Sequence, residues 1–233
     1  MGARIHWIFA LAALMGVACS SSMEVPNPNN LGYQYYPIEV GSYRIYDVVE
    51  VHFPFIGDSD TTHYQLKELI QGIYRQERED TAYYLHRLTR RSAEVDWQLD
   101  SIWTVRKNPR SIVVVENNTP VIKLTFPVKV GASWDSNAMN AEESAVYAIS
   151  KVGVVFEQNG LSFENTLQVV EENNMDTVIN ERYREAIYAE NIGLVYKEAR
   201  YIDYCATSVA CLGEGIIVGG IKKIYTLREY GKE

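Results

Sequence analysis

The chain has few of the residues that carry most metal and covalent chemistry. Its 233 residues include four histidines and three cysteines, and no Gly-x-Ser-x-Gly motif marks a serine nucleophile. The histidines that follow the N-terminal region, His52, His63 and His86, lack the close spacing of zinc ligands. We therefore expect no metal, no cofactor and no enzymatic activity.

Glycine, proline and basic residues are also scarce enough to exclude several classes of protein. With 15 Gly and 7 Pro the chain is neither collagen-like nor of low complexity, and 47% hydrophobic residues exclude a disordered tail. The formal net charge of −8 repels phosphate groups, so we expect no nucleic-acid partner. What is present is a folded acidic chain with 17 tyrosines, of a length that suits one domain.

The one clear apolar run is short and lies near the N-terminus. Arg4 precedes an apolar stretch from Trp7 to Val17, and the small residue Ala18 stands before Cys19. A short positive segment, a short apolar run and small residues at a cleavage point predict a secretory signal peptide over residues 1–18. The run itself is too short to span a bilayer.

The segment Gly16-Val17-Ala18-Cys19 resembles the lipobox of bacterial lipoproteins. The resemblance implies that Cys19 becomes the new N-terminus and carries lipid, which would hold the protein on a membrane. Residues 19–30, rich in Ser, Pro and Asn, then form a flexible tether to a single domain over residues 31–233. Because Gly16 replaces the usual Leu, cleavage by the ordinary signal peptidase, which leaves Cys19 without lipid, stays open as an alternative.

Alternation of apolar and polar residues predicts β-strands along the rest of the chain. The clearest examples cover residues 95–105 and 161–169. Weaker alternation covers residues 43–53, 83–90, 121–126, 194–201 and 221–227. Between strands, Asn159-Gly160 suits a type I′ turn, and residues 173–176 are predicted to form a loop.

Two segments have apolar spacing that also fits a helix. Leu66, Leu69, Ile70 and Ile73 would lie on one helix face, but Gly72 and the β-rich surroundings favour a strand over residues 62–75. Residues 141–152 are similarly ambiguous. In total, about ten antiparallel strands predict a mainly β fold, either a sandwich or a curved, partly closed barrel, with few or no long helices.

A short pattern occurs twice in the chain. Residues 36–43 and residues 126–134 both read aromatic-Pro, hydrophobic, charged, Val-Gly and then an aromatic residue. Two equivalent sites would explain the repeat. Two sheet corners, where Gly permits the turn, explain it more simply and are the favoured interpretation.

These two segments, together with residues 187–198, resemble a family of envelope lipoproteins from Bacteroidota. The resemblance covers Tyr35 to Gly231 and implies a mostly β fold and a place in the cell envelope. It implies no reaction. Surface-exported lipoproteins of these bacteria often carry an acidic cluster soon after the cysteine, whereas here only Glu24 is close, which favours the periplasmic face of the outer membrane.

Three sets of residues are candidate sites. Cys205 and Cys211 are expected to form a disulfide, because a lipidated Cys19 leaves them as a pair in an oxidising compartment. Aromatic residues that could line a ligand cleft are Tyr35, Tyr36, Tyr43, Tyr46 and Trp134. Thr61, Thr81 and Thr177 follow Asp in triplets that resemble the O-glycosylation sites of Bacteroidota.

These observations favour a lipid-anchored, non-enzymatic binding or assembly component of the envelope. Its partners would be the membrane, through the N-terminal lipid, and an envelope protein. A periplasmic carrier of an apolar ligand, such as a lipid or acyl chain, is the first alternative. A glycan or peptidoglycan hydrolase is the second, and it would need two carboxylates that face each other across a cleft.

Overall fold

The computed structural model describes residues 31–76 and 81–233. The predicted signal peptide, Cys19 and the tether lie outside these residues. The described elements are a short 3-10 helix, η2 (Tyr33–Tyr35), and the strands β1 (Ser42–Phe53), β2 (Asp60–Gln76), β3 (Thr81–Arg90), β4 (Gln98–Lys107), β5 (Ser111–Glu116), β6 (Thr119–Thr125), β7 (Ser133–Asp135), β8 (Val146–Gln158), β9 (Leu161–Asp176), β10 (Asn180–Ala189), β11 (Gly193–Tyr204) and β12 (Ile217–Lys232). Within the described ranges, no helix is long and apolar enough to cross a membrane.

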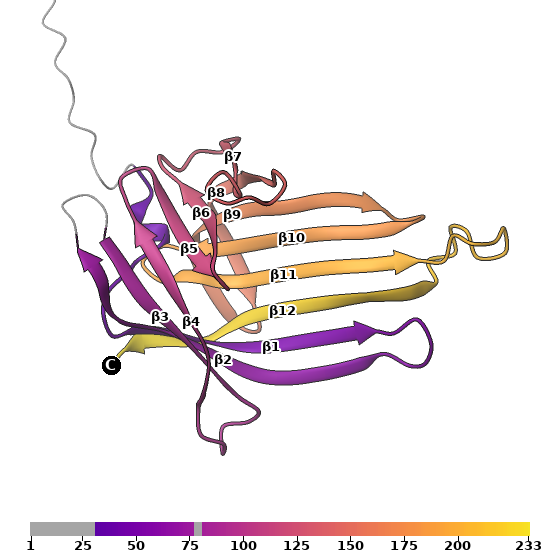
Figure 1. Ribbon diagram of the computed structural model, residues 1–233, viewed down its shortest axis with the longest axis horizontal. Coiled ribbons are helices and arrows are strands. Elements are labelled where there is room, and N and C mark those ends of the chain that lie inside the picture. The colour runs from indigo at the N-terminus through magenta and orange to yellow at the C-terminus, as the bar shows by residue number, and fades with distance from the viewer. Residues whose placement is uncertain (1–30, 77–80) are drawn as a thin grey trace, which may run out of the picture.

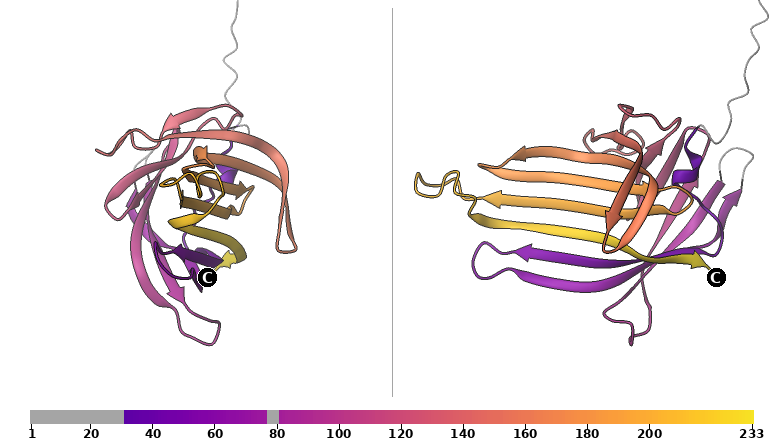
Figure 2. Two further views of the ribbon diagram at one scale, coloured as in Figure 1. Left: turned by 90° about the vertical axis from the view of Figure 1, so that its right-hand side faces the viewer. Right: turned by 180° about the vertical axis from the view of Figure 1, so that it is seen from behind.

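All of these strands belong to one sheet in the order β6-β5-β4-β3-β2-β1-β12-β11-β10-β9-β8-β7 (Figure 1). Neighbours in the sheet are neighbours in sequence, except that β1 pairs antiparallel with β12. The sheet is therefore an up-and-down meander whose first and last strands are joined and whose two edges are β6 and β7. One sheet that curves around its own interior excludes the predicted sandwich and agrees with the barrel alternative (Figure 2).

The β6 and β7 edges meet through individual hydrogen bonds instead of a continuous ladder. The Ile122 amide donates to the carbonyl oxygen of Ser136 over 2.9 Å. The indole N–H of Trp134 donates to the carbonyl oxygen of Ile122 over the same distance, 2.9 Å. These contacts make the sheet a nearly closed barrel.

The sheet has two parts. Strands β1, β2 and β9 to β12 project as an open ribbon beyond strands β3 to β6 (Figure 1). Strands β3 to β6 curve over the other end of the ribbon and enclose the main core. Its buried residues are Tyr35, Ile70, Leu85, Val105, Ile112, Val114, Leu124, Tyr147, Ile149, Leu167, Val169, Ala186 and Tyr188.

The mainly β prediction is confirmed, but the predicted number of strands is too low. Alternation misses β5, because Ile112 and Val113 on its opposite faces are both buried, and it misses β7, which has only three residues. It also does not predict β10. Residues 173–176, predicted as a loop, lie in β9, and the turn follows at residues 177–179.

The structure assigns both segments whose apolar spacing also fits a helix. Residues 62–75 lie in β2, so the strand prediction is confirmed there. Residues 141–145 form a bend and irregular chain, and β8 begins at Val146.

The repeated segments are two equivalent corners of the sheet. Gly41 and Gly131 have φ angles of 86° and 83°, a region that glycine adopts readily. Their amides donate over 2.8 Å to carbonyl oxygens of adjacent strands, Gly41 to Ile70 and Gly131 to Ile149. One corner leads into β1 and the other into β7, as the favoured interpretation requires.

Candidate functional site

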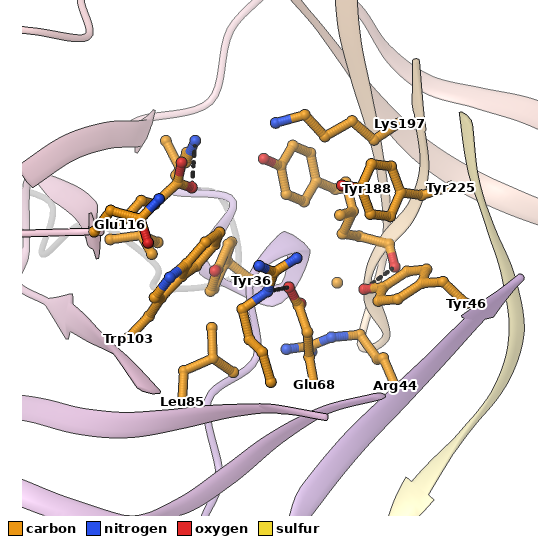
Figure 3. A pocket seen from close by; sticks show the side chains of 16 residues that line it. Tyr36, Arg44, Tyr46, Glu68, Leu85, Trp103, Glu116, Tyr188, Lys197 and Tyr225 are labelled. Atoms are coloured by element: carbon orange, nitrogen blue, oxygen red, sulfur yellow. Dashed lines mark hydrogen bonds and ion pairs between the residues drawn. The ribbon is translucent and has the colours of Figure 1, made fainter. Parts of the chain in front are cut away.

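A cavity of about 310 Å³ lies inside the closed part of the sheet. Its aromatic lining residues are Tyr36, Tyr46, Trp103, Tyr188 and Tyr225, and its charged ones are Arg44, Glu68, Arg87, Glu116, Lys123 and Lys197. Figure 3 shows Glu116 and Trp103 on one side of this space and Tyr188, Lys197 and Tyr225 on the other. The lining therefore comes from both halves of the meander.

One wall of the cavity is a row of alternating charges. Arg44 of β1 is the register partner of Glu68 of β2, and Glu68 is the partner of Arg87 of β3. Arg87 Nε lies 3.4 Å from Glu68 Oε1, and the side chains of both residues are 13% exposed. Cross-strand partners of opposite charge stabilise a sheet, so the row supports its own geometry.

An ion pair between β5 and β6 forms the opposite wall. Lys123 Nζ lies 2.7 Å from Glu116 Oε1. Burial raises the pKa of Glu116, but the ammonium groups of Lys123 and Lys197 outweigh burial, so the pKa lies below its ordinary value. Glu116 is therefore a carboxylate at neutral pH.

One more charged group of the lining comes from β11. Lys197 Nζ lies 3.3 Å from Glu171 Oε2, and the Glu171 side chain is only 1% exposed. Burial lowers the pKa of Lys197, but Glu171 and Glu116 outweigh it and hold that pKa above its ordinary value. Lys197 is therefore an ammonium group that keeps part of its surface open to the cavity.

The aromatic residues supply both apolar faces and hydroxyl groups. The Arg87 guanidinium stacks 3.9 Å from the centre of the Trp103 ring. Tyr46 donates from its hydroxyl to the Leu194 carbonyl oxygen over 3.1 Å. Burial raises the pKa of Tyr36 and of Tyr188 above the ordinary value, so both phenols stay protonated and able to donate.

Two buried donors in the lining lack partners. Arg44 donates from Nη1 to the Ile192 carbonyl oxygen over 3.1 Å, but its Nε has no hydrogen-bond partner among residues 31–76 and 81–233. The same holds for Nε1 of Trp103. Buried polar groups without partners are uncommon in folded proteins, so two in one cavity call for an explanation.

A wider groove of about 910 Å³ adjoins the cavity. Arg87 and Tyr225 line both hollows. Polar residues line much of the groove, among them Thr62, His63 and Gln98.

The predicted aromatic residues divide between the cavity and other roles. Tyr36 and Tyr46 line the cavity. Tyr35 lies in the main core, Tyr43 donates to Glu229 over 2.7 Å, and Trp134 binds across the β6 and β7 edges. The sequence interpretation misses Trp103, Tyr188, Tyr225 and every charged residue of the lining.

The other predicted sites lie away from the cavity. Cys205 and Cys211 are joined by a disulfide, as predicted, in the loop between β11 and β12. Thr61 and Thr177 are exposed and Thr81 is half-buried, so their glycosylation stays a prediction. In the part of the chain that the structure describes, no three His, Cys, Asp or Glu side chains cluster as metal ligands would.

The chain was compared with known families, proteins and structures. No family model matches it, and no curated protein matches it in sequence. A Bacteroides fragilis protein described as exported, with a YmcC-like fold, has a TM-score of 0.46 and 9% identity, over 84% of this chain and 98% of that one. A Parabacteroides distasonis protein described as a lipoprotein has a TM-score of 0.40 and 7% identity, over the same shares of the two chains, 84% and 98%. Neither similarity assigns a function.

Proposed function

We propose that this protein is a non-enzymatic binding protein of the cell envelope that holds a small ligand in the cavity. The observation that carries the proposal is a cavity lined by aromatic faces and by charged groups that other side chains already fix in place. Preformed cavities of this kind, with a few placed polar groups, are the usual form of small-molecule sites. In keeping with the N-terminal segment, we propose that lipid on Cys19 anchors the protein to the periplasmic face of the outer membrane.

A hydrolase is the weaker interpretation of this cavity. Glu68 and Glu116 both line it, and a glycosidase needs two carboxyl groups, one of them a protonated acid with a raised pKa. Glu116 has a lowered pKa and pairs with Lys123, so it is held as an anion and is a poor proton donor. Glu68 is engaged in an ion pair with Arg87.

A carrier of acyl chains is also weaker. An acyl chain in this space would remove Arg87, Lys123 and Lys197 from polar surroundings without giving them new partners. Burial of charged groups without compensation is costly. A ligand with polar groups fits this lining better.

A cavity-filling variant tests the binding proposal. Val114 lines the cavity, whereas its strand neighbour Val115 points to the opposite face. We expect the mature protein, purified from membranes in detergent, to retain a small molecule in native mass spectrometry. The adduct should be lost in Val114→Phe and kept in the matched control Val115→Phe. The proposal fails if the wild type carries no adduct and no fraction of a metabolite extract raises its Tm.

An assembly role is a second candidate, favoured by exposed apolar side chains on loops that neighbour one another. The β1–β2 loop carries Phe55, 81% exposed, and the β11–β12 loop carries Val209, 96% exposed. Both loops lie at the free end of the long strands, because β1 pairs with β12 (Figure 1). Residues 54–60 and 203–217 contain Asp and Glu but no Lys or Arg. The partner surface that complements this end is apolar with a basic rim.

Photo-crosslinking tests this second candidate. A crosslinking residue at position 209 should trap one defined envelope protein, and the purified partner should bind more weakly at high salt. A crosslinker at Val130, an exposed corner position, is the control. Identical products from both positions, or products with lipid alone, would contradict a docking role.

A further inference from the structure

We propose that the cavity binds a ring-sized organic oxyanion, a carboxylate or a phosphate ester, and that Arg44 and Trp103 donate hydrogen bonds to it. This inference deepens the proposed binding function and rests on it. It gives the ligand a chemical class, and it assigns the two unpartnered donors a role.

The net charge of the cavity lining indicates the charge that the ligand carries. Four cationic side chains, Arg44, Arg87, Lys123 and Lys197, line the cavity with two carboxylates, Glu68 and Glu116. Glu171 pairs with Lys197 behind the lining, which leaves a balance of one positive charge. The whole chain has the opposite balance, with a formal net charge of −8. A positive interior in an acidic protein concentrates anions at this place and repels them elsewhere.

The unpartnered donors give the second observation. Arg44 is 5% exposed, yet its Nε has no partner among the described residues, and neither has Nε1 of Trp103. A carboxylate or phosphate oxygen accepts hydrogen bonds from both kinds of N–H group, and bonds to an ionised group are the strong ones. An oxyanion seated against Arg44 and Trp103 would pair these donors, which a purely apolar ligand would leave unpaired.

Size and aromatic content limit the rest of the ligand. A volume of about 310 Å³ leaves room for one ring with its substituents. Tyr36 and Tyr188 lie within 5.9 Å of each other, ring centre to ring centre, and present apolar faces with hydroxyl groups. These surfaces suit a ring that is itself partly polar.

Titration calorimetry on the mature protein in detergent tests the inference. The probes are glucose 1-phosphate and glucuronate, which share a ring but differ in the oxyanion, and neutral glucose. We expect at least one anion to bind more than about 100-fold tighter than glucose, with an affinity that falls as salt is added. Whichever anion binds tighter identifies phosphate or carboxylate as the recognised group. Glucose binding as tightly as both anions would overturn the inference.

Two variants separate the proposed contacts from general packing. Trp103→Phe keeps a ring beneath Arg87 but removes the N–H donor, and should weaken anion binding about tenfold. Glu116→Gln removes a negative charge and releases Lys123, and should strengthen it about tenfold. Weaker binding in Glu116→Gln would contradict the inference even if Trp103→Phe does not fold.

The outcomes also distinguish this inference from the function on which it rests. If Val114→Phe releases a retained molecule that proves to be neutral, the binding function stands and the oxyanion assignment is wrong. If neither a retained molecule nor any probe binds, both are wrong.

Discussion

Lys197 of β11 and Glu171 of β9 form an ion pair across the intervening strand β10, with 3.3 Å between Nζ and Oε2. The Glu171 side chain is almost fully buried and has Lys197 as its paired cation. Burial raises the pKa of Glu171, but Lys197 and Lys123 outweigh it and hold that pKa below its ordinary value. The pair therefore stays ionised inside the protein at neutral pH.

Removal of one partner should be costly because it leaves the other charge buried. We expect Lys197→Met to lower the free energy of unfolding by about 3 kcal/mol. The double variant Lys197→Met with Glu171→Leu should recover most of this loss, since an apolar pair of similar volume replaces the ions. Urea unfolding monitored by fluorescence measures both. A double variant less stable than the single one would contradict the ion-pair explanation.

The lowered pKa values of Glu116 and Glu171 predict acid sensitivity. Each carboxyl binds a proton more readily in the unfolded chain than in the folded protein. Their contribution to stability is therefore present above the unfolded pKa, about 4.5, and is lost as pH falls through the lower folded pKa. The free energy of unfolding should decrease as the pH is lowered from 6 to 2, and this decrease should be smaller in Glu116→Gln. An equally large decrease in that variant would show that Glu116 does not contribute to the acid sensitivity.

The two corner glycines should differ in their tolerance of a side chain. Both have positive φ, so alanine costs about 1–2 kcal/mol at either position. A Cβ at Gly41 would also lie 2.6 Å from the backbone oxygen of Glu233, whereas one at Gly131 meets nothing within 4 Å. Gly41→Ala should therefore destabilise more than Gly131→Ala in urea unfolding, and Gly131→Asn should recover part of the loss. Equal effects at both corners would show that the contact with Glu233 relaxes freely.

Local sequence patterns predicted the turns and strands where local chemistry decides them. Asn159 and Gly160 adopt φ angles of 49° and 79°, as a type I′ turn requires. The helix-like spacing from Leu66 to Ile73 has a local cause as well. The register of β2 against β3 shifts between Ile70 and Gly72, and such bulges disturb the alternation of faces.

The cavity could not be predicted in the same way, because it depends on which strands meet. Arg44, Glu68 and Arg87 lie far apart in sequence, and each alone is typical of a solvated strand face. A weak local clue exists in β5, where Glu116 continues the inward row of Ile112 and Val114. Only the β1–β12 pairing and the meeting of β6 with β7 turn these separate positions into one lining.

We expect lipid on Cys19, which lies outside the residues that the structure describes. Intact mass spectrometry of the protein from bacterial membranes should give a chain that begins at Cys19 and carries acyl groups. Replacement of Cys19 by Ala should leave the protein without this mass and move it out of the membrane fraction, because several acyl chains together give stable anchoring at about 0.8 kcal/mol for each buried methylene. Ser20→Ala, next to the cleavage point, is the matched control and should stay lipidated. A wild-type mass that begins at Cys19 without lipid would instead identify cleavage by the ordinary signal peptidase, and the protein would then be a secreted β domain.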